Sequence, residues 1–374
     1  TVLGEAERYG AVSVNRAEVV ELLERDGRAD GVRCRDAASG DEFEIQADNV
    51  VNATGVWADR LRPREIHDEA EVPKIAPSRG THVTVPLEKL PVTHAACVVP
   101  AGESRTIFAL PWYGRALIGT TDNDYEGELE HVQPSGDDIT YLLDAVNAFF
   151  GTDLDRGDLT GAYAGVRPLI STGDPRKSVD ISRKAELYET SSGMLTITGG
   201  KLTTWRRMAK QVVDRLVERE GRNAPCRTDD LPLGLAADDG DLDPPDNIDG
   251  SKLHEGLRDL LAFRYGHASR NVLRLLADRP ELADPIVPGQ PDLLAEVVIA
   301  ARHEQAGSVA DVLLRRTRLG LVAAPQLRTA DSVRRVAEVL GGELGWDESR
   351  IAAEAQRWVE EARAEGIDPA AALD

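Results

Sequence analysis

The sequence is poor in cysteine and has no long apolar run. Its three cysteines, Cys34, Cys97 and Cys226, are too scattered for a disulfide framework or a CxxC metal site, so we expect structural thiols and a reducing compartment. No run of about 18 or more apolar residues occurs, and no charged segment followed by an apolar one opens the chain. The sequence therefore predicts neither a membrane-spanning helix nor a secretory signal.

Basic charge is also scarce. The 374 residues include 65 acidic and 44 basic side chains, which gives a net charge of −21, and only seven of the basic residues are lysine. This balance disfavours nucleic-acid binding through phosphate neutralisation. An acidic, Arg-rich composition is expected either from a GC-rich genome or from a salt-adapted cytoplasm, and this composition fits both. With 41% hydrophobic residues, the chain is long enough for two or three domains with a large core.

Several kinds of segment follow one another along the chain. Asp-Gly and Ser-Gly turn signals divide residues 11–52 into a small β-meander, with strands expected over 11–14, 19–25, 32–36 and 42–46. Strand patterns return between 79 and 122. Apolar spacing predicts a helix over 136–150, with one face made of Ile139, Leu142, Leu143, Val146 and Phe149. Helical patterns recur after residue 252, over 254–265, 267–278, 291–305, 308–320, 329–341 and 347–366. The chain begins at Thr1 without Met and enters a segment like a helix end, so we expect a truncated N-terminus.

The stretch 196–208 is the most informative part of the sequence. β-Branched residues lead into Gly199 and Gly200 and then into a charged helix, which predicts a strand, a tight turn and a helix N-terminus. Adjacent glycines let the backbone approach a flat or phosphorylated ligand closely, and Lys201 would stand at the edge of that ligand. The N–H groups of the first helical turn would point at it: Leu202, Thr203 and Thr204. Taken alone, an ordinary strand-to-helix turn explains the stretch equally well.

Three nucleotide and metal motifs are incomplete. The Gly-Lys pair is not a triphosphate loop, because Leu202 replaces the Ser or Thr that would bind magnesium and Leu195 replaces the first glycine. An Asp-Asn-Asp-Tyr-Glu-Gly run resembles a calcium loop, but its twelfth position is Gln133 rather than a bidentate carboxylate. No histidine follows four residues after His303, which excludes zinc-protease chemistry. We expect no metal site.

A short apolar strand over 50–55 follows the meander and ends in small residues. Such an ending leaves room for the pyrophosphate and ribose of a dinucleotide, and its residues here are Ala53, Thr54 and Gly55. The same Ala-Thr-Gly sequence is also a common turn.

Two further side chains are suited to an anionic substrate. Arg167 lies between Val and Pro, on a stiff, extended backbone that would present its guanidinium fork to an anion at a fixed angle. His82 falls on the first strand of the expected substrate sheet, and histidine is well suited to accept a proton near neutral pH. A single strand histidine is more often a hydrogen-bonded core residue, and only its neighbours favour a chemical role.

Five motifs occur in one order along the chain. They are Val-Asn-Ala-Thr-Gly-Val-Trp, Arg-Gly-Thr-His, Leu-Pro-Trp with Ile-Gly-Thr-Thr-Asp, Gly-Val-Arg-Pro-Leu, and Gly-Gly-Lys-Leu-Thr-Thr-Trp-Arg. With this series, the chain closely resembles FAD-dependent glycerol-3-phosphate dehydrogenase of the aerobic bacterial respiratory type. The tail, with Ala-Arg-His-Glu from Ala301 and Asp-Val-Leu-Leu-Arg-Arg-Thr-Arg-Leu from Asp311, resembles the helical C-terminal domain of that family.

The resemblance implies a mixed α/β and α+β fold with a partial FAD-binding domain of the two-dinucleotide-binding, glutathione-reductase-like type. The expected domains are 1–77 (remainder of the FAD-binding domain), 78–195 (antiparallel substrate-binding sheet), 196–222 (strand and helix returning to the FAD domain), 223–252 (acidic linker) and 253–374 (all-helical C-terminal domain). The family's Gly-x-Gly-x-x-Gly turn, with the arginine after it, does not occur in this sequence. We therefore expect the chain alone to bind FAD weakly or not at all and to lack dehydrogenase activity.

The implied reaction is oxidation of sn-glycerol 3-phosphate at C2 to dihydroxyacetone phosphate, with hydride passing to the flavin. His82 would be the base or the group that orients the hydroxyl, while Arg167 and Lys201 would hold the phosphate or the developing alkoxide. The cofactor-binding residues would be Val19, Ala53, Thr54, Gly55, Gly199, Gly200, Leu202, Thr203 and Thr204, with Val19 at the adenine.

The resemblance also implies an electron acceptor and a location. Electrons would pass to a quinone in glycerol catabolism, which implies a cytoplasmic protein held peripherally at the inner face of the cytoplasmic membrane. The same motifs fit a glycerol-3-phosphate oxidase that uses oxygen, and an inactive substrate-binding fragment is the remaining alternative. The expected partners are glycerol 3-phosphate and quinone, with a homodimer compatible and no nucleic acid.

Overall fold

The computed structural model describes residues 1–61, 74–93, 95–102, 105–171, 185–234 and 256–368. The chain divides into two compact units. The first contains Thr1–Arg79, Asn123–Leu129 and Val166–Leu233, and the second contains Gly80–Asp122, Glu130–Gly165 and Gly234–Asp374. Strands β5 (Lys74–Pro86) and β10 (Gly161–Ser171) contribute residues to both units.

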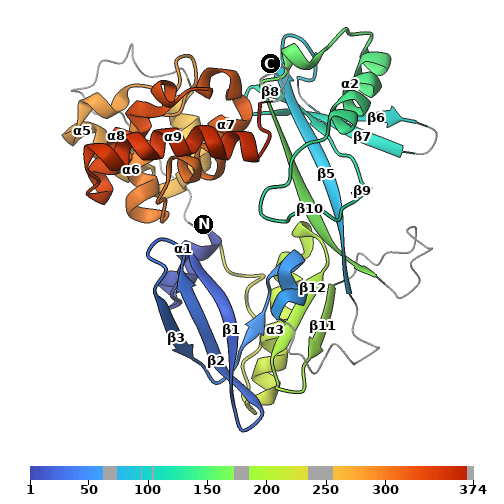
Figure 1. The fold of residues 1–374 in the computed structure, drawn as a ribbon, viewed down its shortest axis with the longest axis vertical. Helices are drawn as coiled ribbons and strands as arrows, with labels where there is room; N and C mark the ends of the chain where they lie inside the picture. The colour runs from blue at the N-terminus through green and yellow to red at the C-terminus, as the bar shows by residue number, and fades with distance from the viewer. Residues whose placement is uncertain (62–73, 94, 103–104, 172–184, 235–255, 369–374) are drawn as a thin grey trace. The chain divides into compact units, whose positions relative to one another are not determined.

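The first unit opens with α1 (Val2–Arg8) and an antiparallel meander of β1 (Ala17–Arg25), β2 (Arg28–Asp36) and β3 (Glu42–Gln46) (Figure 1). The turn between β1 and β2 has positive φ at both Asp26 (53°) and Gly27 (74°), a backbone that matches the twist of a tight hairpin. The predicted meander is therefore confirmed from β1 to β3, but the first strand predicted for it, over residues 11–14, is wrong, because those residues form no strand.

A second sheet of the first unit has the order β11-β12-β4 and joins segments far apart in the sequence. β4 (Val51–Asn52) lies parallel to β12 (Leu195–Gly199), and β11 (Ala185–Glu189) lies antiparallel to β12. The 3-10 helix η1 (Gly55–Leu61) follows β4, while η5 (Leu202–Thr204) and α3 (Trp205–Arg219) follow β12. The apolar face of α3 packs on the sheet through Met208, Val212 and Leu216.

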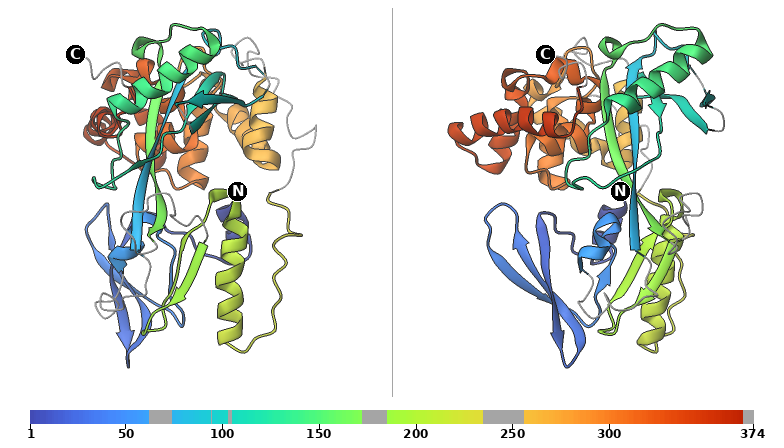
Figure 2. Two further views of the ribbon diagram at one scale, coloured as in Figure 1. Left: turned by 90° about the vertical axis from the view of Figure 1, so that its right-hand side faces the viewer. Right: turned by 45° about the vertical axis from the view of Figure 1, so that its right-hand side comes forward.

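The largest sheet has the order β10-β5-β8-β7-β6, and β9 (Asn123–Asp124) pairs with β5. Antiparallel pairing links β5 to β8 (Arg115–Gly119), β8 to β7 (Arg105–Trp112) and β7 to β6 (Cys97–Ala101). α2 (Gly136–Phe150) has the bounds that the spacing predicts, and it packs on this sheet (Figure 2). The prediction is wrong for Phe149, which is half exposed and contacts Phe150 edge to face.

The described part of the predicted helical region, residues 256–368, is helical (Figure 1). Its α-helices are α4 (Leu257–Tyr265), α5 (Ser269–Asp278), α6 (Leu294–His303), α7 (Leu319–Val322), α8 (Ala330–Leu344) and α9 (Glu348–Ala364). Short 3-10 segments of this region lie at Gly266–Ala268, Pro280–Ala283 and Ala324–Leu327, and another, Arg156–Asp158, lies between α2 and β10.

The continuous helix predicted over 308–320 is wrong. Asp311–Arg316 forms a π-helical segment, and Arg318 has φ of 64°, which breaks the right-handed helical backbone before α7. The core of this region surrounds Trp358, which is 1% exposed and donates from Nε1 to the Leu327 carbonyl at 2.7 Å. Among the described residues, every helix is too short or too polar to cross a membrane.

Candidate functional site

The two glycines after β12 adopt the left-handed backbone that the sequence predicts there. Gly199 has φ of 70° and Gly200 has φ of 75°, values that side chains other than glycine rarely allow. The next turn is closed by Thr204, whose Oγ1 accepts from Lys201 N (3.1 Å) and donates to Lys201 O (2.8 Å). The Thr204 hydroxyl is thus used inside the turn. The N–H groups of Leu202 and Thr203 open this turn, where the helix itself offers them no acceptor.

The end of β4 lies beside this turn, because parallel pairing places Val51 opposite Leu195 and Asn52 opposite Thr196. Asn52 organises the strand end, although sequence reasoning did not single it out. Its buried side chain donates to the Ala58 carbonyl (3.1 Å) and accepts from the Thr54 hydroxyl (2.7 Å). The Thr54 hydroxyl is therefore also used within the protein. In the sequence, the role of Asn52 could have been found only from its position directly before Ala-Thr-Gly.

A pocket of about 570 Å³ opens where these two strand ends meet, entirely within the first unit. It brings together half of the predicted site residues: Ala53, Gly55, Gly199, Gly200, Lys201 and Leu202. Pro168 of β10 and the apolar face of α3 complete the wall, the latter through Trp205, Met208, Ala209, Val212 and Val213. Its volume is in the range that holds small molecules and parts of cofactors.

The lining of this pocket fits a flat, mostly apolar ligand with polar edges. Thr198 lies in the wall, and its buried Oγ1 has no hydrogen-bond partner in the described structure. Leu202 is 88% exposed, and a Cβ at Gly55 would meet no heavy atom within 4 Å, so the strand end leaves space beside the pocket. Gly200 has a different role, because its Cβ would lie 2.5 Å from Met208 Sδ. A buried hydroxyl without a partner and a glycine-lined wall are what a flavin edge would require.

The three predicted catalytic residues are divided between the two units. Arg167, which is half-buried on β10, lies in the same unit as Lys201, which is exposed. Arg167 does not line the pocket, but the next residue, Pro168, does. His82 lies on β5 in the second unit, where its ring stacks on Tyr163 with centroids 4.9 Å apart and planes 9° apart. The convergence of all three on one substrate therefore stays a prediction.

Four predicted cofactor contacts lie outside the pocket lining. Val19 is half-buried on β1 opposite Cys34, and Thr54, Thr203 and Thr204 adjoin lining residues. Their roles also stay predictions.

The second unit contains its own pocket, of about 410 Å³, lined by residues of the β7–β8 turn, α4 and the segment before α6. At its wall, Arg264 Nη1 lies 2.7 Å from Asp292 Oδ1 and 2.6 Å from Glu296 Oε1, with all three side chains at most 7% exposed. Tyr265 donates to Glu296 at 2.9 Å. Burial, together with the charge of Glu296, raises the pKa of Asp292 to about 6.

Two family models match the chain. The model described as FAD dependent oxidoreductase matches residues 1–206, and the model described as C-terminal domain of alpha-glycerophosphate oxidase matches residues 194–351.

Curated relatives include two proteins of Mycobacterium tuberculosis (strain ATCC 25618 / H37Rv). Glycerol-3-phosphate dehydrogenase 2 is 34% identical over 375 residues, which cover 99% of this chain and 63% of that protein. Glycerol-3-phosphate dehydrogenase 1 is 39% identical over 301 residues, which cover 78% of this chain and 55% of that protein. The chain thus spans less than two thirds of the length of either relative.

A solved structure has a similar fold. The glycerol-3-phosphate dehydrogenase from Bacillus halodurans complexed with FAD superposes with a TM-score of 0.81 at 26% identity, over 98% of this chain and 72% of that one. This similarity confirms the predicted fold class, and FAD is confirmed as the cofactor of the family. Since the first family model matches more than half of the sequence, including the residues at the ends of β4 and β12 that line the pocket, the chain belongs to the FAD dependent oxidoreductase family.

Proposed function

We propose that this chain is part of an FAD-dependent dehydrogenase that oxidises sn-glycerol 3-phosphate to dihydroxyacetone phosphate. The observation that carries the proposal is the pocket at the paired ends of β4 and β12, where Gly55, Gly199, Gly200 and Lys201 line one space. The names of the relatives support the choice of substrate. Because the chain spans 63% or less of those relatives, the activity is proposed for the complete enzyme that contains it.

Each side chain has a separate task in this proposal. FAD, when bound, supplies the hydride acceptor for the C2 hydrogen of the substrate. The glycines let the backbone approach the cofactor, and the start of η5 and α3 adds partial positive charge beside it. Arg167 and Lys201 bind the phosphate or stabilise the alkoxide, and His82 accepts the hydroxyl proton. The hydride and the proton together balance oxidation of the alcohol to the ketone.

The substrate test uses the complete enzyme loaded with FAD under anaerobic conditions. Addition of sn-glycerol 3-phosphate should bleach the flavin absorbance, because the reduced flavin accumulates without an acceptor. Glycerol, which lacks the phosphate that Arg167 or Lys201 would bind, should bleach it far more slowly. Equal rates with both alcohols would contradict phosphate recognition, and the absence of bleaching by either would contradict the proposed function.

We propose a quinone as the electron acceptor, with the enzyme held peripherally at the inner face of the cytoplasmic membrane. Oxygen is the second candidate, because the family model matched by residues 194–351 takes its name from an alpha-glycerophosphate oxidase. Turnover should be compared with a quinone analogue without oxygen and with oxygen alone. Faster reduction of the quinone analogue supports a dehydrogenase, and faster oxygen consumption with peroxide release supports an oxidase.

Substitution of Gly200 by alanine is expected to weaken FAD binding by about tenfold, or roughly 1.4 kcal/mol, because the new side chain displaces the pocket wall. The added Cβ would lie 2.5 Å from Met208 Sδ, so the turn or α3 must shift at the pocket wall. Flavin fluorescence titration of the complete enzyme measures the affinity. Gly193→Ala is the matched control, because Gly193 has φ of +80° but no atom within 4 Å of its Cβ. Equal losses in both variants would assign the effect to backbone strain alone.

Replacement of Arg167 by lysine is expected to lower kcat/KM for glycerol 3-phosphate by about 10–100-fold, although the charge is unchanged. A bidentate guanidinium fork becomes a point charge, and hydrogen bonds to charged groups are worth roughly 1.5–3 kcal/mol. Steady-state kinetics of the complete enzyme are the measurement. Arg207→Lys on the exposed side of α3 is the control and should keep the wild-type rate. An unchanged kcat/KM in the Arg167 variant would remove this residue from the site.

A further inference from the structure

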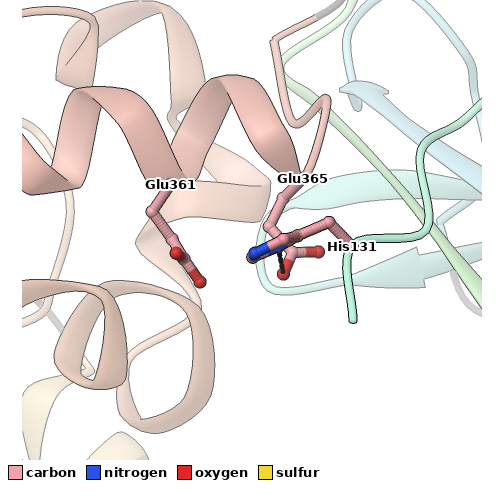
Figure 3. A group of neighbouring side chains, drawn as sticks. All are labelled: His131, Glu361 and Glu365. Atoms are coloured by element: carbon pink, nitrogen blue, oxygen red, sulfur yellow. Dashed lines mark hydrogen bonds and ion pairs between the residues drawn. The ribbon is translucent and has the colours of Figure 1, made fainter. Parts of the chain in front are cut away.

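Three side chains of the second unit that are suited to metal binding lie together, far from the flavin pocket residues in the sequence. They are His131, in the segment before α2, and Glu361 and Glu365, one turn apart at the end of α9 (Figure 3). Their ligand atoms all lie within 4.8 Å of one another, and His131 Nδ1 is 3.2 Å from Glu365 Oε1. Figure 3 shows the imidazole beside the Glu365 carboxylate.

Contacts with the main chain at the end of α9 hold the segment around His131 in place. Gln133 Nε2 donates to the carbonyls of Arg363 (3.2 Å) and Ala364 (2.9 Å), so the side chain of Gln133 satisfies acceptors at the end of α9. A Cβ at Gly366 would lie 3.1 Å from Pro134 Cδ, which means that the two backbones approach closely at this point. The position of His131 is therefore set by its neighbours and does not depend on its own bond to Glu365.

The charges of this cluster are unfavourable unless a cation is present. Glu361 and Glu365 carry like charges one helical turn apart, and both stand at a helix C-terminus, where the helix dipole favours positive groups. Glu361 is partly buried, and its side chain makes no hydrogen bond or ion pair with any residue of the described chain. Among the described residues, two carboxylates and the helix end thus converge on one imidazole.

We propose that His131, Glu361 and Glu365 bind a divalent transition-metal ion, with zinc as the preferred probe. An imidazole nitrogen and two carboxylate oxygens are common zinc ligands, and small side-chain rotations would bring atoms spaced this closely to metal bonds of about 2.0–2.2 Å. The imidazole disfavours calcium and magnesium, which prefer oxygen ligands alone. The exposed side of His131 leaves the fourth position to water. The metal neutralises both carboxylates.

The metal would join parts of the second unit that are distant in sequence. His131 and Glu365 are separated by 234 positions: one precedes α2, which packs on the large sheet, and the other ends α9 of the helical region. A ligand that binds the folded state alone stabilises it, so zinc acts here as a clip between the sheet and the helical region of this unit. The sequence predicted no metal site because that prediction rested only on motifs of neighbouring residues. Ligands 234 positions apart in the sequence form no such motif.

Equilibrium dialysis of the full chain against Zn²⁺, with excess Ca²⁺ to occupy the acidic surface, tests the site. Glu361→Gln removes one ligand without breaking any hydrogen bond of the described chain, and Glu360→Gln, one position earlier and exposed, is its matched control. The wild type and Glu360→Gln should bind one more equivalent of zinc than Glu361→Gln. Equal zinc stoichiometry and affinity in all three proteins would overturn the proposal.

Thermal unfolding gives a second readout. At free zinc about 100 times its dissociation constant, the wild type should melt ~3 °C or more above the metal-free protein. The same zinc should leave the melting temperature of His131→Gln and Glu361→Gln unchanged. A zinc-induced rise that persists in the His131→Gln variant, or one that calcium reproduces, would contradict a site built on the imidazole. Both readouts are independent of FAD and glycerol 3-phosphate, so their failure leaves the proposed function untouched.

Discussion

Replacement of Arg264 by alanine is expected to lower the free energy of unfolding by about 3–5 kcal/mol, the usual cost of removing one partner from a buried ion pair. The guanidinium stands between two carboxylates, with Nη1 at 2.7 Å from Asp292 and 2.6 Å from Glu296. Without it, two buried acids face each other in a pocket wall and must either stay charged without a partner or take up protons. Denaturant unfolding of the purified chain measures the loss.

The pH dependence distinguishes this cause from lost packing. Burial and Glu296 already raise the pKa of Asp292 to about 6, above its value in an unfolded chain. A raised carboxyl pKa means that the folded state binds the proton more tightly, so the contribution of Asp292 to stability is fully present below about pH 4 and is lost as the pH rises through 6. Loss of the guanidinium should raise the pKa of this carboxyl further. The gap between the wild type and the variant should therefore be small at acid pH and widen toward neutrality.

Two further variants complete this experiment. Arg274→Ala, on the exposed side of α5, removes an arginine without a buried partner and should change stability by less than about 0.5 kcal/mol. Replacing Arg264, Asp292 and Glu296 together by apolar residues of similar size should cost much less than Arg264→Ala, because no charge is left unpaired. A pH-independent loss in Arg264→Ala would show that the arginine acts through its packing.

The local features of the fold could be predicted from the sequence because short-range physics determines them. The turn at Asp26-Gly27 needs two residues that tolerate positive φ, and the chain places such residues there. The apolar spacing of 136–150 matches the helical period, so the predicted bounds of α2 agree with the structure. Gly199 and Gly200 similarly revealed the turn that lines the pocket.

The features that the sequence did not reveal depend on partners distant along the chain. Phe149 has the right period for the apolar face of α2, yet its ring stays half exposed, while the neighbouring Phe150 packs against the core beneath the helix. Asn52 reads as an ordinary strand residue until its bonds to Thr54 and Ala58 are seen. The Arg264 cluster and the histidine of the proposed zinc site likewise require contacts between different helices or segments, which no local pattern encodes.

In the complete enzyme, His82→Gln is expected to reduce kcat by about 100-fold or more, since a positioned general base contributes roughly 10²–10⁴-fold. The ring is held on both sides: it stacks on Tyr163 at 4.9 Å, and the added Cβ of an alanine at Gly119 would lie 2.2 Å from its Cδ2. Glutamine retains a polar side chain of similar reach but cannot accept the substrate proton. The solvent isotope effect and the pH profile of kcat should both change, while flavin content should not.

The cross-strand glycine provides an independent test of the same residue. Gly119→Ala keeps the imidazole but must displace it, because Gly119 of β8 lies directly opposite His82 of β5 and the ring occupies the space above it. Its kcat should therefore fall toward that of His82→Gln, and the two changes combined should cost little more than either alone. His303→Gln and Gly342→Ala, at exposed positions of the helical region, are the controls and should keep the wild-type rate. A wild-type kcat in His82→Gln would reduce His82 to a structural strand residue, and additive losses in the double variant would mean that Gly119 acts on the site by another route.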